Sequence, residues 1–238
     1  MSEVIIRELD NAKLLVLSEK GENHIKSGIC NQDSYSFKVD DSGNYAFVVA
    51  DGVSTCAFAK EGADKACETV CNLLSECMEL AEDDIKKIVF AEWKSLIKDN
   101  WNDYGTTINF IYVYPERIVM GKVGDGAVLV KNSEITSYLY EESEFYSSKT
   151  FALGTFLPKQ SFRVNLIKHN DRLPLLLVLM TDGIVKEVDS KKYKEFSEYI
   201  DLNIGNPNFV LELKNWISSL NKKNGDDKTI FICKIKGI

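Results

Sequence analysis

The sequence predicts an α+β fold, because its strands and helices come in groups and do not alternate one by one. Several short apolar runs come first, followed by two amphipathic helices, further strands, two more helices and a last strand. This order is typical of helices gathered on the faces of antiparallel sheets. The 238 residues also hold no linker rich in proline, glycine or serine and no solenoid-type repeat. We therefore expect residues 1–238 to form a single domain.

The first part of the chain predicts strands joined by polar turns. Residues 13–17 are apolar and indicate a first strand, and residues 20–32 are polar and contain glycine, which indicates a loop. Residues 33–39 alternate between apolar and polar side chains, and a turn at 41–44 leads into the apolar run 45–51. This pattern predicts a β-hairpin.

Two long amphipathic helices are predicted next. In residues 59–77 and 85–97 the apolar side chains recur at intervals of three and four, as on one face of a helix. Asp83 or Asp84 is expected to cap the second helix. The two helices are expected to pack as a pair.

The second half of the chain predicts a meander of antiparallel strands, two helices and a final strand. Residues 141–161 lack clear periodicity, and a stretch of this length without it is often functional. We expect this stretch to contribute to substrate specificity. Ser190 is expected to cap the first of the two helices. The expected strands and helices are 105–113, 118–123, 127–130, 135–139, 162–167, 175–181, 193–200, 209–220 and 229–235.

Four of the apolar runs carry an aspartate at one end, with glycine beside it. A single Asp-Gly pair is an ordinary turn. A hairpin turn is therefore the alternative interpretation of Asp125-Gly126, and a solvated loop that of Asp226-Asp227. Asp227 is expected to cap its own loop. Four such ends on the most apolar strands nevertheless favour a shared acidic site. The motifs are Asp51-Gly52, Asp125-Gly126, Asp182-Gly183 and Gly225-Asp226-Asp227.

Carboxylates gathered at strand ends repel one another unless a cation lies between them. Oxygen ligands without histidine or cysteine favour Mg²⁺ or Mn²⁺, and two such ions can activate a water for attack on phosphorus. The sequence has two histidines, His24 and His169, and no EF-hand loop or phosphate-binding P-loop. Its six cysteines include no Cys-x-x-Cys pair, which favours free thiols over a zinc site. The chemistry predicted is metal-assisted phosphoester hydrolysis.

Charge and hydropathy disfavour two classes of partner. The net charge is −7, from 29 basic and 36 acidic residues, so we expect no nucleic-acid partner. Residues 1–10 lack the apolar core of a signal peptide, and the longest apolar run, 173–180, is too short to span a bilayer. We therefore expect a cytoplasmic protein with no membrane partner.

The order of these motifs resembles that of the metal-dependent (PPM, type 2C) Ser/Thr protein phosphatases. The resemblance spans nearly the whole chain, and residues 21–33 look like the short bacterial branch of the family. It implies a sandwich of two antiparallel β-sheets flanked by pairs of α-helices, in four αββα layers. The motifs are Asn31-Gln32-Asp33, Val49-Ala50-Asp51-Gly52, Gly105-Thr106-Thr107, Val123-Gly124-Asp125-Gly126, Thr150-Phe151-Ala152-Leu153-Gly154, Met180-Thr181-Asp182-Gly183 and Gly225-Asp226-Asp227-Lys228-Thr229.

The resemblance also implies a site for two Mg²⁺ or Mn²⁺ ions, with a weaker third position. Asp51 would bridge two ions, and the Gly52 carbonyl would bind one of them. Asp182 and Asp226 would complete the first metal site. Asp125, together with Asp182, would match the third position.

Catalysis is implied for Asp33, Asp51 and Asp182, and Asp33 would hold metal-bound water. The implied reaction is hydrolysis of phosphoserine and phosphothreonine by a water that the two ions activate. A phosphorylated protein would be the substrate, and a cognate Ser/Thr kinase a further partner. A preference for free phosphoamino acids or nucleotides would instead indicate a phosphatase for small phosphate compounds.

Some residues depart from the family pattern and keep another function open. Many members have glutamate where this chain has Gln32, whose neutral amide offers an oxygen but no charge. The family's phosphate-binding arginine corresponds to Gly28, for which His24 or Lys26 is a substitute; His24 is alternatively a hydrogen-bonded loop residue. The histidine of eukaryotic members is absent at Val53-Ser54. A catalytically weak, phosphoprotein-binding module on the same fold is therefore the alternative function.

Overall fold

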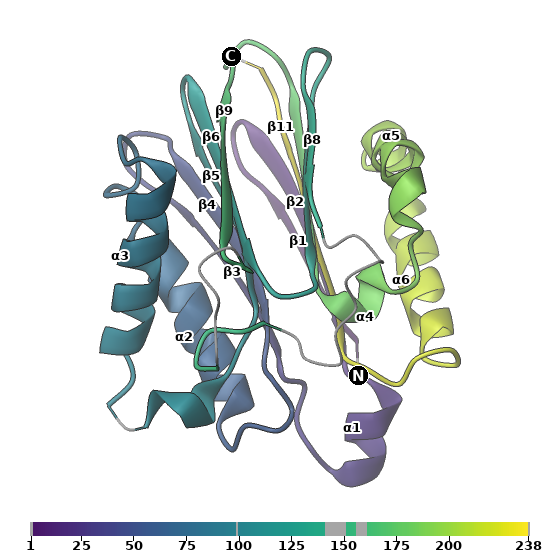
Figure 1. Cartoon of the computed structure of the whole chain (residues 1–238). Helices are drawn as coiled ribbons and strands as arrows, with labels where there is room; N and C mark the ends of the chain where they lie inside the picture. The colour runs from purple at the N-terminus through teal and green to yellow at the C-terminus, as the bar shows by residue number, and fades with distance from the viewer. Residues whose placement is uncertain (1, 99, 141–150, 156–160, 238) are drawn as a thin grey trace.

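Two antiparallel β-sheets pack face to face between two layers of helices (Figure 1). The structure is a computed structural model and describes residues 2–98, 100–140, 151–155 and 161–237. It confirms the predicted α+β fold and the αββα sandwich. Most of the stretch 141–161 lies outside the described residues, so its expected part in specificity stays a prediction.

One sheet has six strands and the other five, and all neighbouring strands pair antiparallel. The six-stranded sheet is, in spatial order, β1 (Ser2–Glu8), β2 (Ala12–Glu19), β11 (Lys228–Ile235), β10 (Leu175–Met180), β7 (Ala127–Lys131) and β8 (Thr136–Leu139). The five-stranded sheet is β3 (Asp33–Val39), β4 (Tyr45–Asp51), β5 (Ile108–Tyr114), β6 (Arg117–Val123) and β9 (Arg163–Lys168).

The helices cover the outer faces of the two sheets. On the five-stranded sheet lie α2 (Ala59–Asn72) and α3 (Glu82–Ser95), with the 3₁₀ turn η1 (Trp101–Tyr104). On the six-stranded sheet lie α4 (Asp182–Val185), η4 (Ser190–Lys192), α5 (Tyr193–Asn203) and α6 (Phe209–Leu220). The short helix α1 (Glu22–Ser27) lies at one end of the sandwich (Figure 1).

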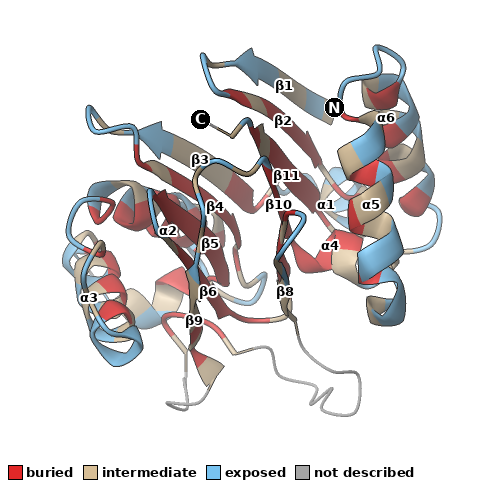
Figure 2. Cartoon of the chain, turned by 90° about the horizontal axis from the view of Figure 1, so that it is seen from above, coloured by how far each residue is buried: buried red, intermediate tan, exposed pale blue. Residues whose placement is uncertain are grey.

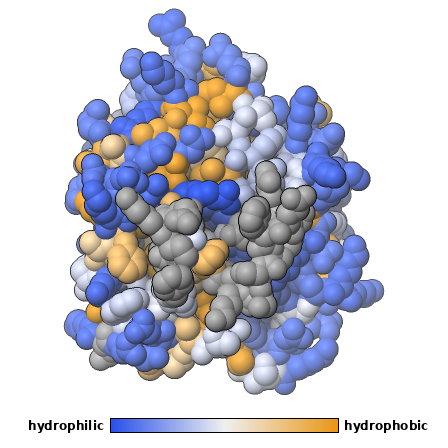
Figure 3. Space-filling model, in the orientation of Figure 1, coloured by the Kyte–Doolittle hydropathy of each residue, from blue (hydrophilic) through white to orange (hydrophobic). Residues whose placement is uncertain are grey.

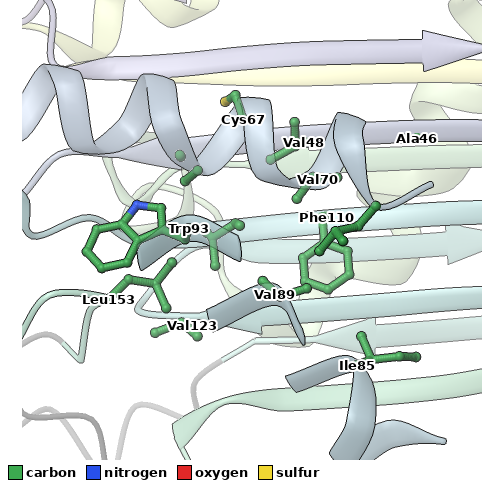
Figure 4. Packing of buried hydrophobic residues seen from close by; sticks show 14 of the residues in the cluster. Ala46, Val48, Cys67, Val70, Ile85, Val89, Trp93, Phe110, Val123 and Leu153 are labelled. Atoms are coloured by element: carbon green, nitrogen blue, oxygen red, sulfur yellow. The ribbon is translucent and has the colours of Figure 1, made fainter. Parts of the chain in front are cut away.

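Three hydrophobic clusters separate the four layers. One fills the space between the sheets, and Phe231 meets Phe47 there edge to face, with ring centroids 5.5 Å apart. The second joins α2 and α3 to the five-stranded sheet; Figure 4 shows Trp93 of α3 beside Leu153 in it. The third joins α4, α5 and α6 to the six-stranded sheet. In Figure 2 the central strands of the two sheets, such as β5 and β10, are almost wholly buried, which explains why their sequences are such continuous apolar runs.

The outer faces of the helices are polar, as their amphipathic pattern predicts. On the face seen in Figure 3, hydrophilic side chains dominate over both helical layers, and hydrophobic ones gather in the upper middle, where Figure 1 places the strands. Within the described ranges, no helix combines the length and the apolar character that a bilayer crossing requires.

Two elements near the N-terminus were missed by the sequence reasoning, and both are mostly solvent-exposed. Strand β1 pairs with β2 from Ser2 opposite Glu19 to Glu8 opposite Lys13, at the edge of its sheet. Helix α1 has no buried residue and ends at Gly28, whose φ of 71° is a left-handed helix cap. Neither element has the continuous apolar run or apolar stripe on which the predictions depended.

Three details of the helices also differ from the predictions. The first long helix ends at Asn72, and the apolar residues up to Cys77 follow in a turn that packs on the same core. At α3 the N-cap is Ala81, and no side chain of the described residues caps the helix there. Asp189, not Ser190, caps the 3₁₀ turn before α5, because its carboxylate accepts a bond from the Lys191 amide at 3.0 Å.

Candidate metal-binding active site

Strand ends from both sheets meet at a cleft of about 130 Å³. The cleft lies at the end of the sandwich where Figure 1 labels α1 and α4. The structure brings together around it all five residues that the sequence suggested as metal ligands. These residues are Asp51, Gly52, Asp125, Asp182 and Asp226.

Asp51 is the last residue of β4, so its backbone is fixed by the sheet. In β3 its register partner is Asp33. The Asp51 amide donates to the Thr107 hydroxyl at 3.0 Å, and its carbonyl accepts from the Thr107 amide at 2.8 Å and the Thr106 hydroxyl at 3.0 Å. Thr106 in turn pairs with Leu153. Two further motifs of the family resemblance therefore support the Asp51 strand end.

The glycines next to the aspartates leave room for close backbone approaches. A Cβ on Gly52 would lie 2.4 Å from the Ala59 carbonyl oxygen at the start of α2. A Cβ on Gly183 would lie 1.9 Å from the carbonyl oxygen of Asp227. Both contacts are with backbone, which cannot simply rotate away, so only glycine lets these chain segments meet at the cleft.

Asp182 and Asp226 come from neighbouring strands of the six-stranded sheet. Asp182 is the first residue of α4 and is separated from the end of β10 by Thr181 alone, and Asp226 lies in the loop before β11. The buried Lys228 fixes that loop, because its ammonium donates to the Asn221 side chain at 2.8 Å and to the carbonyls of Asn224 at 3.0 Å and Asp226 at 2.6 Å. These three bonds hold the backbone of the loop in place and thereby position Asp226 at the cleft.

Asp33 does not line the cleft but lies behind it, with only 3% of its surface exposed. Its Oδ2 accepts a bond from the Thr181 hydroxyl at 2.8 Å. Burial, with the charges of Asp227 and Asp182, raises the pKa of Asp33 to about 8, although threonine hydroxyls oppose the shift. In the metal-free protein this carboxyl therefore carries a proton at neutral pH.

Burial and neighbouring charges raise the pKa of two of the cleft carboxyls, Asp51 and Asp182. Burial, followed by the charges of the neighbouring aspartates, raises the pKa of Asp51 well above its usual value. Burial and the charges of Asp125 and Asp226 raise the pKa of Asp182 to about 6, and Lys186 acts in the opposite direction. A cluster of carboxylates of this kind is most stable when protons or cations are bound to it.

The donor atoms fit a hard divalent cation. Buried oxygens without a hydrogen-bond partner among the described residues include Gln32 Oε1, Asp33 Oδ1 and Asp182 Oδ1. Buried oxygens in that state need a ligand, and carboxylate, amide and backbone oxygens are those that Mg²⁺ and Mn²⁺ prefer. In the part of the chain that the structure describes, however, no three histidine, cysteine, aspartate or glutamate side chains already gather closely enough to hold an ion.

The sequence reasoning missed Lys186, the residue after α4. Its ammonium contacts Asp182 Oδ2 and lies 3.3 Å from Asp226 Oδ2. The signal was available, since a lysine four residues after an aspartate pairs with it across one helical turn. It was overlooked because the four-residue helix that creates the spacing was not predicted.

The role of Asp227 also differs from the prediction. Its carboxylate anchors a distant segment, accepting bonds from the Gly21 amide at 2.7 Å, from His24 Nδ1 at 2.8 Å and from the Gln32 amide at 2.6 Å. His24 is therefore hydrogen-bonded, as one of the two predictions for it proposed, but it lies in helix α1 and not in a loop. It also lines the cleft.

Comparisons with known proteins agree with this architecture. A sequence model of the family described as Protein phosphatase 2C matches residues 20–218. No curated protein sequence matches the chain. Solved structures that resemble it include RsbX in complex with magnesium, at 17% identity and TM-score 0.59, covering 98% of this chain and 100% of that one.

Two further similar structures are of bacterial Ser/Thr phosphatases. Stp1 from Staphylococcus aureus has 16% identity and TM-score 0.65, covering 97% of this chain and 99% of that one. PstP/Ppp from Mycobacterium tuberculosis has 14% identity and TM-score 0.61, covering 95% and 99%. Identities this low show a shared fold, whereas the family match spans most of the sequence. The chain therefore belongs to the protein phosphatase 2C family.

Proposed function

We propose that this chain is a Mg²⁺- or Mn²⁺-dependent protein phosphatase that hydrolyses phosphoserine and phosphothreonine in proteins. Residues 1–238 would form one phosphatase domain, and a Ser/Thr kinase would supply the substrate. The observation that carries the proposal is the cleft lined by Asp51 from one sheet and by Asp182 and Asp226 from the other. Membership of the family supports the reaction class.

Each cleft residue has a role in this proposal. Asp51 would bridge two ions, the Gly52 carbonyl would bind one of them, and Asp182 and Asp226 would complete the first site. Asp125 would serve a weaker third position. Bound divalent ions supply positive charge for the phosphate and lower the pKa of water.

Asp33 would act from behind the cleft. Its buried carboxyl, bonded to the Thr181 hydroxyl, can hold a proton and orient water at the inner wall of the site. The side-chain oxygen of Gln32, which has no hydrogen-bond partner among the described residues, would be a neutral ligand of the second ion.

The experiment is hydrolysis of a chromogenic aryl phosphate with Mn²⁺, with and without a chelator. We expect Asp182→Asn to lower the rate by about a hundredfold or more, because it removes a charged ligand. The matched control is Asp41→Asn, an exposed aspartate in the turn at the far end of the β3–β4 hairpin. The proposal is wrong if the wild-type protein binds no divalent ion and cleaves no phosphoester. Phosphoprotein set against free phosphoserine then distinguishes the protein phosphatase from one for small phosphate compounds.

A weakly catalytic phosphoprotein-binding module is the second candidate, favoured by Gln32 in place of an acid. It predicts metal and phosphoprotein binding with negligible turnover, and a large gain of rate in Gln32→Glu. The corresponding change at Gly28 is less informative, because φ there is 71° and any side chain would be strained.

A further inference from the structure

Lys186 places a positive charge between two of the cleft carboxylates. Its ammonium contacts Asp182 Oδ2 and lies 3.3 Å from Asp226 Oδ2. The backbone holds it near, because the Lys186 amide donates to the Asp182 carbonyl at 2.9 Å. The side chain is 44% exposed, whereas that of Asp182 is 9% exposed. The ammonium therefore has a route to solvent that the carboxylate lacks.

The lysine contacts one oxygen of each carboxylate, Asp182 Oδ2 and Asp226 Oδ2. On Asp226, the other oxygen already accepts a bond from the Asp227 amide at 3.1 Å. On Asp182, the other oxygen is buried and has no hydrogen-bond partner among the described residues. A cation that binds Asp182 Oδ2 and Asp226 Oδ2 together must therefore displace the ammonium. This agrees with the observation that the described side chains form no ready set of three acidic ligands.

The charge balance explains why the lysine is held there without a metal. Burial lowers the pKa of Lys186, but the charges of Asp182, Asp226 and Asp125 outweigh that effect and raise it. A charged ammonium offsets part of the repulsion among the cleft carboxylates, which would otherwise need protons. It can offset only one charge, whereas a divalent ion supplies two and can bind both carboxylates at once.

We infer that Lys186 is a tethered competitor of the metal, which stabilises the metal-free cleft and must leave it before an ion binds Asp182 and Asp226. The inference rests on the proposed function, since it concerns the same site. Lys186 thereby sets the concentration of divalent ion at which the site fills. Removing it has two opposite effects: the metal-free protein becomes less stable, and its affinity for the ion rises.

The experiment compares wild type with Lys186→Met by titration calorimetry with Mn²⁺ and by thermal unfolding with and without Mn²⁺. We expect the Kd of the tighter site to fall by about tenfold or more in Lys186→Met, since a positive charge in contact with the ligands is lost. We also expect a lower Tm than wild type without metal and a larger rise in Tm with it. Lys191→Met is the control, because it removes the same charge from an exposed position five residues away.

Two further variants keep the test decisive. Lys186→Gln removes the charge but keeps hydrogen-bond donors, so it should fold where the methionine variant does not and still bind Mn²⁺ more tightly. Lys186→Arg keeps the charge and should stay near wild type in both readouts.

Each outcome has a definite meaning. Equal Mn²⁺ affinity in wild type, Lys186→Met and Lys186→Gln overturns the inference but leaves the metal phosphatase intact. Weaker Mn²⁺ binding in the uncharged variants also overturns it, and would mean that the lysine supports the bound state. Absence of Mn²⁺ binding in all variants and the wild type would instead remove the proposed function, and the inference with it.

Discussion

The buried aspartates make the metal-free protein sensitive to pH. In the folded chain the pKa of Asp33 is about 8 and that of Asp182 about 6, whereas an aspartate in an unfolded chain titrates near about 3.9. The folded state therefore binds these protons more tightly than the unfolded state. Their contribution to stability is complete below the unfolded pKa and is lost as the pH rises through about 6 and then about 8.

We accordingly expect the Tm of the metal-free protein to fall as the pH is raised from about 5 to about 9. Saturating Mn²⁺ should flatten this slope, because the ion replaces the protons that offset the carboxylate repulsion. Thermal unfolding across this range, with a chelator and with Mn²⁺, checks the prediction. In Asp33→Asn, measured with the chelator, the fall of Tm that accompanies the titration of Asp33 at about pH 8 should be absent. A Tm that rises with pH in the chelated wild type would contradict the assignment of raised pKa values.

At the scale of residues, much of the site could be predicted from the sequence. Asp51 and Asp182 each end an apolar run, and such runs become buried strands with little ambiguity. Lys186 could not be found in this way, because its contact depends on a four-residue helix. Neither could the anchor at Asp227, whose partner Gly21 is some two hundred positions away along the chain. Contacts of that range follow from the pairing of the strands, which no local pattern records.

At the scale of elements, Asp227 holds the segment that joins β2 to β3. Its carboxylate accepts three bonds from this segment and is 2% exposed. In Asp227→Asn one carboxylate oxygen is replaced by an NH₂ group. This group cannot accept the hydrogen bonds that the segment now donates to that oxygen. We expect the free energy of unfolding to fall by about 2 kcal/mol or more, since bonds to a buried charged acceptor are lost.

Urea unfolding of Asp227→Asn beside Asp41→Asn measures this effect. A Mn²⁺ titration of the same proteins should show weaker binding in Asp227→Asn, because Gln32 loses the bond that fixes its backbone. If both variants unfold like the wild type, the segment is held by its packing and not by Asp227.

The same scale explains which elements the sequence could predict. The long helices and the central strands were expected because each buries one face or both, and burial imposes a period on the sequence. Strand β1 is at an edge with most of its residues exposed, and α1 buries none. Their formation depends on pairing with β2 and on the Asp227 anchor, both of which are tertiary contacts.

At the scale of the whole molecule, the candidate site is an assembly of two sheets. Asp51 ends a strand of the five-stranded sheet, whereas Asp182 and Asp226 lie next to strands β10 and β11 of the six-stranded one. The distance between these ligands is therefore set by the cluster that packs between the sheets. Phe231 is central to it, meeting Phe47 at 5.5 Å and Phe37 at 6.2 Å.

This arrangement predicts that two phenylalanine substitutions of equal size will differ in their effect on metal binding. Phe231→Leu opens space between the sheets, whereas Phe209→Leu opens it under α6, in the outer cluster. Both residues are nearly fully buried, so each substitution should lower the free energy of unfolding by about 1–2 kcal/mol. Only Phe231→Leu should also weaken Mn²⁺ binding, by about threefold or more, since ligand positions depend on the shell that supports them. Urea unfolding and Mn²⁺ titration of both proteins make the comparison. Equal Mn²⁺ affinities at equal stability loss would mean that each strand end is positioned by its own loops, and that the packing between the sheets serves stability alone.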